Sequence, residues 1–489
     1  MKKTLFTLLC IIAAAPAFAG DHYASEFGIK SNGTTMNTNS IQKAIDFISE
    51  EEGGGKLIFK VGRYLTGTIQ LKSNVTIELG EGAVLVGSPN PYDYRKAGPV
   101  SFAQALITAE GAENIAITGL GVIDGQGREV ANNFLAQIAA GFIKDPLGLG
   151  RPANRPHLVL ITKCKGVTLQ GINLRNSACW TCTTDRCEDL TIDKVTLESR
   201  AFWNNDGFDI VDCKNVAVRN CFVNSSDDGI CLKSHNKDVC NDNILVENNV
   251  ITSSASAIKF GTFGVGGFRN VKILNNTVYD TFRSAIALES VDGGFLENVE
   301  VDGLKSINTC NAIFLTVGQR RGDKKSSMEN IVIKNVYAEV TNGKPDYGLD
   351  YEGPSLEDEP RNCSPCSIVG LEGQNIKNVT LENIEIKFPG GGDLSYAKVG
   401  TDELSKVPEL PKAYPEFSVW KELPAWAFYI RHAEGVTFSN VKVSAAAADY
   451  RPAIVLDDVD GGLFKGVKAT SPKSRGTIYQ AKNCKNIRK

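Results

Sequence analysis

Two clusters of carboxylates in the stretch 202–234 carry the chemistry that this sequence predicts. Asp206 and Asp209 form the first cluster and the pair Asp227-Asp228 the second, and each has a glycine beside it and an alternating apolar run after it. In a chain that coils with a period near this spacing, the clusters lie on one face of neighbouring turns, about 4.8 Å apart. Acetal hydrolysis needs one protonated carboxyl for the leaving oxygen and one ionised carboxylate to activate water. Repulsion between close carboxylates helps to separate their pKa values. The spacing therefore predicts a hydrolytic carboxylate site.

A structural interpretation competes with the catalytic one, because Asn, Asp and Gly also form the corners of coiled chains. For Asp209 and Asp212 the corner role is favoured. For Asp206, Asp227 and Asp228 together, catalysis is favoured, since an isolated Asp-Gly would not repeat one turn later.

The elements that must position these residues follow from an internal repeat. A unit of Asn, Asp or Gly, then Val, Ile or Leu, one further residue and another apolar residue recurs along the chain. Between residues 166 and 298 successive units are 23, 26, 28, 27 and 28 residues apart. Short strands of fixed period joined by such corners are typical of a β-solenoid. We therefore expect an all-β chain, a right-handed parallel β-helix of about ten coils. The units begin at Asn74, Asn114, Gly166, Asp189, Asn215, Asn243, Asn270, Asn298, Asn330, Asn378 and Gly435.

The two ends of the repeat region carry different signals. Residues 39–48 place apolar side chains at helical spacing, which predicts one amphipathic helix that caps the first coil, followed by strands alone. Near the other end, residues 408–426 are rich in Pro and aromatic residues. This excursion could wall a carbohydrate cleft or simply pack on the solenoid.

The first nineteen residues have the pattern of a secretory signal peptide. Lys2 and Lys3 precede an apolar run, and Ala17-Phe-Ala19 provides small residues for cleavage. A lipid anchor at Cys10 is the less favoured alternative, because the small residue expected before such a cysteine is missing. We expect an exported protein, periplasmic or extracellular, with residues 20–489 as a single domain.

The composition indicates which kinds of partner to expect. Without Lys2 and Lys3 the chain has 51 basic and 56 acidic residues, a formal charge of −5 without a dense basic stripe. This balance argues against nucleic acid as a partner. No later segment holds eighteen uninterrupted apolar residues, so we expect no membrane span, and we expect a monomer.

Twelve cysteines remain after the signal segment. The pairs Cys179/Cys182 and Cys363/Cys366 have the spacing of half a zinc site, but neither has a histidine nearby. Local disulfide bridges or buried thiols in the strand stack are the favoured interpretation.

The central motifs resemble those of glycoside hydrolase family 28, which includes polygalacturonases, rhamnogalacturonan hydrolases and xylogalacturonan hydrolases. Asn204-Asn-Asp206-Gly-Phe-Asp209 is similar to the family's Asn-Thr-Asp-Gly motif, and Ser226-Asp-Asp-Gly229 to its Gly-Asp-Asp motif. The resemblance implies an inverting hydrolase of a plant cell-wall polysaccharide or oligosaccharide, without metal or cofactor. It implies Asp227 as the general acid, Asp206 and Asp228 as the residues that activate water, and Asn204 beside them.

Two further motifs of polygalacturonases are changed in this chain. Ser256 stands where the histidine of Gly-His-Gly is expected, and Ala287 and Glu289 replace the arginine and lysine of Arg-Ile-Lys. The lost cations would bind a galacturonate carboxylate through charge-assisted hydrogen bonds. A neutral sugar beside the scissile bond, and so rhamnogalacturonan-type or exo-acting hydrolysis, is therefore favoured over endo-polygalacturonase activity. Glu289 could bind a sugar hydroxyl or act as an extra carboxylate.

Other cations could replace those that are missing. We hypothesise that Lys233, Lys259 and the pair Arg320-Arg321 do so, with exposed coil corners as the competing interpretation. His235 is the histidine nearest the clusters in sequence, and residues 234–241 around it have the composition of a solvated loop.

Two other functions remain open at this point. A polysaccharide lyase on the same fold would pair Ca²⁺ with a basic residue, but no Arg or Lys is expected inside the Asp cluster. A solenoid that binds carbohydrate without cleaving it is the second alternative.

Overall fold

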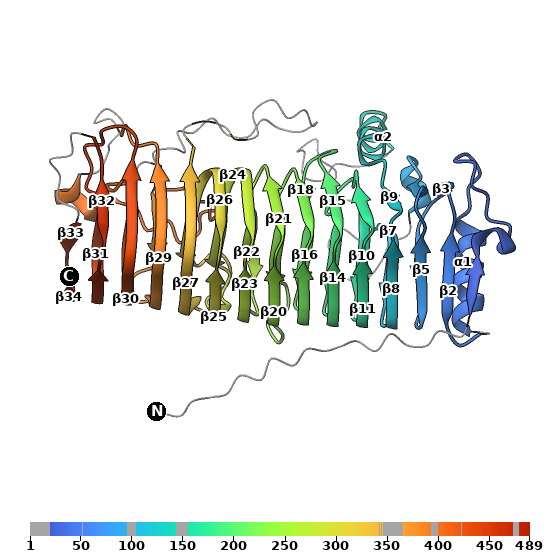
Figure 1. Ribbon diagram of the computed structural model, residues 1–489, viewed down its shortest axis with the longest axis horizontal. Coiled ribbons are helices and arrows are strands. Elements are labelled where there is room, and N and C mark those ends of the chain that lie inside the picture. The colour runs from blue at the N-terminus through green and yellow to red at the C-terminus, as the bar shows by residue number, and fades with distance from the viewer. Residues whose placement is uncertain are drawn as a thin grey trace.

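A computed structural model describes residues 20–50, 52–94, 104–142, 155–341, 343, 345, 365–392, 400–421, 423–472 and 479–489. The expected signal segment, with Cys10, lies outside these ranges. The chain winds as a right-handed parallel β-helix, with its coils stacked along the longest axis of the molecule (Figure 1). The predicted fold class is confirmed.

Three parallel sheets form the walls of the solenoid, and the longest strands bend from one sheet into the next. The first sheet is built from β1 (Asp21–Tyr23), β2 (Gly55–Phe59), β5 (Val75–Leu79), β8 (Glu113–Gly119), β11 (Lys165–Gln170), β14 (Glu188–Asp193), β17 (Lys214–Arg219), β20 (Asn241–Glu247), β23 (Phe268–Leu274), β25 (Phe295–Asp302), β27 (Ser327–Val340), β29 (Ile376–Phe388), β30 (Phe428–Ala445), β31 (Ile454–Lys465) and β34 (Lys485–Arg488). The second is built from β3 (Gly62–Thr66), β6 (Ala83–Gly87), β9 (Val122–Asp124), β12 (Asn173–Arg175), β15 (Thr196–Ser199), β18 (Phe222–Ser225), β21 (Val250–Ser253), β24 (Thr277–Ser290), β26 (Lys305–Val317), parts of β27, β29 and β30, and β32 (Lys468–Thr470). The third sheet is built from β4 (Ile69–Leu71), β7 (Ala105–Glu110), β10 (His157–Thr162), β13 (Cys182–Asp185), β16 (Phe208–Val211), β19 (Ile230–Ser234), β22 (Ile258–Gly264), parts of β24, β26, β30 and β31, with β28 (Cys366–Val369) and β33 (Tyr479–Lys482).

The repeat found in the sequence marks the first sheet. Eleven of its fifteen strands carry a predicted unit, and β1, β2, β31 and β34 extend the stack beyond the expected ten coils. The corner residue of each unit adopts a left-handed backbone, as at Asn215 (φ 55°) and Asn243 (φ 60°), a conformation that Asn and Gly tolerate best. The Asn243 side-chain amide donates to the side-chain oxygen of Asn215 at 2.9 Å, so that corners also bond from coil to coil. Alternate strand residues fill one apolar core that extends from Ala24 to Phe464.

Helices lie at the edges of the stack. The predicted capping helix is confirmed as α1 (Thr38–Glu50), which buries Ile41, Ala44, Ile45 and Ile48. The expectation that only strands follow it is wrong, because α2 (Gly127–Ala139) projects beyond the strand stack (Figure 1). Short 3₁₀ turns form at Ala24–Phe27, Pro91–Asp93 and Thr401–Lys406. Within the described ranges, no helix combines the length and apolar character that crossing a bilayer requires.

The cysteines of the described chain are buried or partly buried thiols, and none of these eleven forms a disulfide. Cys179 and Cys182 are both fully buried, so the buried-thiol interpretation holds for that pair. Cys363 lies outside the described residues. The solenoid is therefore held together by its core and strand ladders over the described part of the chain.

Candidate active site

The register of the third sheet brings the two carboxylate clusters together. Phe208 pairs with Ile230, so one coil at this place takes 22 residues. The amide of Gly207 donates to the carbonyl oxygen of Asp228 at 2.8 Å, which sets Asp206 directly against Asp228. Carboxylate oxygens of these two residues and Cys231 Sγ lie within 4.8 Å of one another. The expected stacking on neighbouring coils is confirmed.

Strand alternation decides which side chains face this cluster. In β16 and β19 the side chains of Phe208, Ile210, Ile230 and Leu232 belong to the apolar core. The intervening residues Asp209, Cys231 and Lys233 consequently point to the other face of the sheet. Asp209 is fully buried within a strand, so the favoured interpretation of it as a coil corner is wrong.

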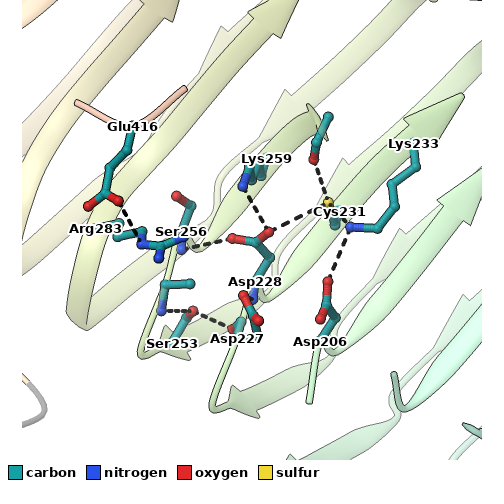
Figure 2. A network of polar contacts seen from close by, with 12 residues as sticks. Asp206, Asp227, Asp228, Cys231, Lys233, Ser253, Ser256, Lys259, Arg283 and Glu416 are labelled. Carbon is teal, nitrogen blue, oxygen red and sulfur yellow. Dashed lines mark hydrogen bonds and ion pairs between the residues drawn. The ribbon is translucent and has the colours of Figure 1, made fainter. Parts of the chain in front are cut away.

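Lys233 lies inside the carboxylate cluster. Its Nζ is 3.1 Å from Asp206 Oδ2 and 3.0 Å from Cys231 Sγ (Figure 2). The same atom lies 3.1 Å from Asp209 Oδ1. The ammonium also lies 4.7 Å from the centre of the Trp180 ring, in cation–π geometry. Only 4% of Lys233 is exposed.

Lys259, one coil further on, forms the second buried ion pair. Its Nζ lies 3.1 Å from Asp228 Oδ2 and donates to Tyr414 Oη at 3.1 Å, and 1% of the residue is exposed. The interpretation of Lys233 and Lys259 as exposed corners is therefore wrong. The expectation that no Arg or Lys lies inside the Asp cluster is also wrong, because outward strand positions on adjacent coils point at the same carboxylates.

Arg283 completes the cationic side of the site and was not predicted. Its amide donates to the carbonyl oxygen of Ala255 at 2.9 Å, and Ala255 stands one coil beyond Asp227, so these residues form one column across three coils. Arg283 Nε lies 3.4 Å from Glu416 Oε2 (Figure 2). Adding two steps of 28 residues to Asp227 leads to Arg283, which is the signal that could have identified it.

The excursion 408–421 covers this part of the third sheet. Phe417 is buried against Ala287, Cys310 and Phe314, which anchors the segment to the solenoid. Tyr414 remains 48% exposed. The segment therefore packs on the solenoid, as one of its two interpretations expected, and it places Tyr414 beside Lys259.

Three cations surround the Tyr414 ring. Lys259 Nζ lies 5.1 Å, Arg320 Cζ 5.4 Å and Arg283 Cζ 5.9 Å from its centre. Arg320 Nη1 is 3.8 Å from the carboxylate of Asp292, which is an ion pair and not a hydrogen bond. The structure therefore places Lys259, Arg320 and Arg283 around one ring, and their role as replacement cations stays a hypothesis.

Arg321 points elsewhere. Its guanidinium lies 4.2 Å from the centre of the Phe263 ring, and half of its side chain is exposed. His235 packs edge-on against the same Phe263 ring, with ring centres 4.7 Å apart, and its ring centre lies 6.5 Å from that of Trp180. Burial, together with nearby Lys233, lowers the pKa of His235 to about 4. Residues 234–241 are buried at both ends and exposed only at their tip, so the expectation of a solvated loop holds in part.

Asn204 and Ser256 touch the carboxylates in different ways. Asn204 has a left-handed backbone (φ 56°), and its side-chain amide donates to Asp227 Oδ2 at 3.4 Å while its oxygen accepts from Arg155 at 2.9 Å. Ser256 contacts Asp228 through its backbone amide, which donates to Oδ1 at 3.1 Å. Asp212 accepts from the amides of residues 235 and 236, in agreement with its expected corner role.

The electrostatic environment separates Asp227 from Asp228. Burial and the charge of Asp228 raise the pKa of Asp227, and Arg283 and Lys259 only partly offset this. Burial also disfavours the charged form of Asp228, but Lys259, Lys233 and Arg283 outweigh it and hold its pKa below the ordinary value. Asp227 is therefore suited to carry a proton and Asp228 to remain ionised.

The neighbouring pair behaves differently. Burial and the charge of Asp209 raise the pKa of Asp206 well above its ordinary value, although Lys233 opposes this. Burial likewise raises the pKa of Asp209 to about 6, with Lys233 opposing. Two carboxylates that share one ammonium repel each other, which favours a proton on one of them.

Glu289 is a fourth buried acid at the edge of the site. Burial raises its pKa to about 8 against the lowering effect of Lys259, and its Oε2 has no hydrogen-bond partner among the described residues. It lies one coil beyond Gly261, on the side of Arg320. At mildly acidic pH this side chain is neutral and able to donate a hydrogen bond.

One group in the described chain has the donor set for a metal ion, namely Asp206, Asp228 and Cys231. The Lys233 ammonium lies within 3.1 Å of Asp206 and 3.0 Å of Cys231. A second cation at that point would be repelled by this ammonium. The lysine thus supplies the positive charge that the cluster requires.

The coiled fold and the stacked carboxylates define a class of carbohydrate-active β-helices. The family model for glycosyl hydrolases family 28 matches residues 58–344, more than half of the chain. The chain therefore belongs to glycoside hydrolase family 28 and is a glycoside hydrolase, as the motifs indicated.

Known relatives are polygalacturonases and exopolygalacturonases at low identity. The exo-poly-alpha-D-galacturonosidase of Dickeya chrysanthemi is 23% identical over 430 residues, covering 74% of this chain and 70% of the relative. The probable exopolygalacturonase B of Aspergillus terreus is 26% identical over 367 residues, covering 70% of this chain and 78% of the relative. Among solved structures, the exopolygalacturonase of Thermotoga maritima has a TM-score of 0.60 and 24% identity, covering 76% of this chain and 87% of that protein. The family 28 exopolygalacturonase of Yersinia enterocolitica also has a TM-score of 0.60, with 21% identity and coverage of 96% and 78%. These two structures support the fold.

Proposed function

We propose that this protein is an inverting hydrolase of galacturonate-containing pectic chains, in which Asp227 is the general acid and Asp228, with Asp206, activates water. The observation that carries the proposal is the stacking of Asp206 against Asp228, with Asp227 alongside and its pKa displaced in the opposite direction to that of Asp228. Acetal hydrolysis requires one carboxyl group that is protonated and one that is ionised.

In the proposed reaction, protonated Asp227 donates its proton to the glycosidic oxygen as the bond from the anomeric carbon to that oxygen breaks. Asp228 is held ionised by Lys259 and the Ser256 amide, and it takes a proton from a water molecule. The oxygen of that water bonds to the anomeric carbon from the opposite face. Asp206 positions the water, because its Oδ2 is committed to Lys233 and its Oδ1 has no partner among the described residues.

The cations beside the acid favour an acidic sugar next to the scissile bond. Lys259 and Arg283 both lie close enough to Asp227 to lower its pKa, and a uronate carboxylate bound there would meet two positive charges. This weakens the argument for a neutral sugar, which depended on the loss of Arg and Lys at 287 and 289. With an acidic sugar at this place, exo-acting hydrolysis of a galacturonate chain, the activity named for the Dickeya chrysanthemi relative, is favoured over rhamnogalacturonan-type hydrolysis.

The lyase alternative requires a neutral lysine that can abstract a proton, and the two lysines of the cluster do not fit that role. Burial alone would lower the pKa of Lys233, but Cys231, Asp209 and Asp206 raise it well above the ordinary value. Asp228 does the same for Lys259 against its burial. Both side chains are therefore protonated and act as fixed cations.

The proposal is tested with Asp227→Asn, and with Asp238→Asn in an exposed turn as the matched control. Loss of a general acid lowers kcat by roughly 10²- to 10⁴-fold. Reducing ends released from galacturonate oligomers measure the rate, and nuclear magnetic resonance of the first product identifies its anomer. An unchanged rate in Asp227→Asn would refute the assignment. An unsaturated product from the wild type would favour a lyase, and binding without any product would favour a non-catalytic solenoid.

A further inference from the structure

A surface depression of about 440 Å³ opens beside Arg320, one of the three cations around Tyr414, and none of the proposed catalytic carboxylates lines it. It is formed by the turn after β26, the turn before β29 and the segment 408–421. Its lining residues are Gln319, Arg320, Gly322, Asp323, Lys325, Gln374 and Lys412.

Three buried polar atoms in this depression have no hydrogen-bond partner among the described residues: Gln319 Oε1, Gln374 Oε1 and Arg320 Nη1. The nearest acid to Arg320 Nη1 is Asp292 at 3.8 Å, too far for a hydrogen bond. Buried polar atoms of folded proteins are nearly always paired with protein groups or ordered water, so two acceptors and one charged donor in residues that line one depression mark it as a place for water or a polar ligand.

The orientation of Gln319 is fixed by its other end. Its Nε2 donates to the carbonyl oxygens of Gly322 at 2.9 Å and Lys324 at 2.7 Å. Carbonyl oxygens only accept, so the amide nitrogen must face them and Oε1 must face away. The acceptor is therefore held in place before any ligand arrives.

The charges of the lining select the ligand. Arg320, Lys325 and Lys412 supply three positive charges, against the carboxylates of Asp323 in the lining and of Asp292, which pairs with Arg320 at 3.8 Å. A carboxylate would pair with the cations, while hydroxyl groups would donate to the two glutamine oxygens. A sugar acid carries both kinds of group on one ring.

We propose that this depression is a distal subsite for a uronate residue of the same chain that is hydrolysed, an inference that rests on the proposed function. From β19, which follows Asp228, to β26 the third sheet advances three strands, roughly 14 Å at about 4.8 Å a step. A single sugar ring does not span that distance, so the subsite binds a sugar beyond those that flank the scissile bond. Arg320 connects the two places, since its guanidinium also lies 5.4 Å from the centre of the Tyr414 ring.

The test compares acidic oligosaccharides of increasing length in the double variant Lys325→Gln/Lys412→Gln and in the control Lys324→Gln. Lys324 is exposed on the same turn but does not line the depression. For long galacturonate oligomers we expect KM to rise roughly fivefold in the double variant with kcat unchanged, since each exposed ion pair contributes modestly. The shortest oligomer that is cleaved should show no change.

A second variant and a second readout keep the proposal open to refutation. Gln374→Glu replaces an acceptor by a like charge at nearly constant shape and should also raise KM for long acidic oligomers. Carboxyl-reduced oligomers should respond to neither variant, and an equal response would show that the site does not select uronates. Calorimetric binding of a long galacturonate oligomer to Asp227→Asn, with and without the double substitution, measures the subsite independently of turnover. Equal affinities of Asp227→Asn with and without the double substitution would refute the subsite. A wild type that cleaves no oligomer would refute the proposed function, and the binding result would still stand.

Discussion

Replacing Glu289 by glutamine should make the folded protein less sensitive to alkaline pH. Glu289 is 1% exposed, and burial raises its pKa from 4.5 to about 8. Because the folded-state pKa is above the unfolded one, folding must take up a proton at every pH between these values. Stability is therefore complete below about pH 4.5 and falls as the pH rises toward 8. At about 1.36 kcal/mol per pKa unit, the penalty that accumulates between pH 5 and pH 9 is about 4 kcal/mol.

The size of the expected change in Tm follows from the length of the chain. Unfolding entropy of about 2.1 cal/mol/K per residue gives about 1 kcal/mol/K for about 470 residues, so the penalty corresponds to about 4 °C. Thermal unfolding of wild type and Glu289→Gln at pH 5 and pH 9 should show the variant gaining about that much at the higher pH only. The control is Glu385→Gln on the exposed face of β29, which should show no such difference. A Glu289→Gln effect that is equal at both pH values would refute the reasoning.

Two further variants address the catalytic acid and the loop above it. Arg283→Gln removes a charge that lowers the pKa of Asp227, so the alkaline limb of the pH profile of kcat should move to higher pH. A limb that stays in place or moves to lower pH would contradict the effect of Arg283 on Asp227. Phe417→Ala removes the buried anchor of the segment 408–421 and should lower the free energy of unfolding by about 3 kcal/mol. Because Tyr414 is then held less firmly, KM for acidic oligomers should rise about tenfold. Tyr414→Phe keeps the anchor. An identical KM in the wild type, Phe417→Ala and Tyr414→Phe would show that the segment does not contact substrate.

The fold could be predicted because its rules are local. Each coil repeats a corner residue that tolerates a left-handed backbone and an alternation that fills the core, and both are visible in any single unit such as the one at Asn243. Helix α2 was missed since Val130, Ala131 and Phe134 give it only one short apolar face among strand patterns. Helical spacing over so few positions does not separate a helix from a loop.

The site could be predicted only for residues that are separated in sequence by whole coils. Asp206 and Asp228 are one period apart, and the strand alternation that turns Asp209 away from the apolar core also points Lys233 at it. Tyr414 reaches Lys259 from 155 residues away in sequence. No period connects them, because the contact depends on how an irregular segment folds back over the sheet.

The altered residues of the third sheet have a joint physical explanation within the proposed function. Ala287 stands where the family's arginine is expected, and its small side chain leaves the space that Phe417 fills. Phe417 in turn holds Tyr414 in reach of Lys259, so the cation lost from the strand is replaced by cations gathered around a loop tyrosine. Glu289 does not undo this replacement below about pH 8, because its raised pKa keeps it neutral and unable to repel a uronate. The same titration that destabilises the folded protein at alkaline pH therefore adds a negative charge beside the bound carboxylate, and acidic substrates lose affinity over that same range of pH.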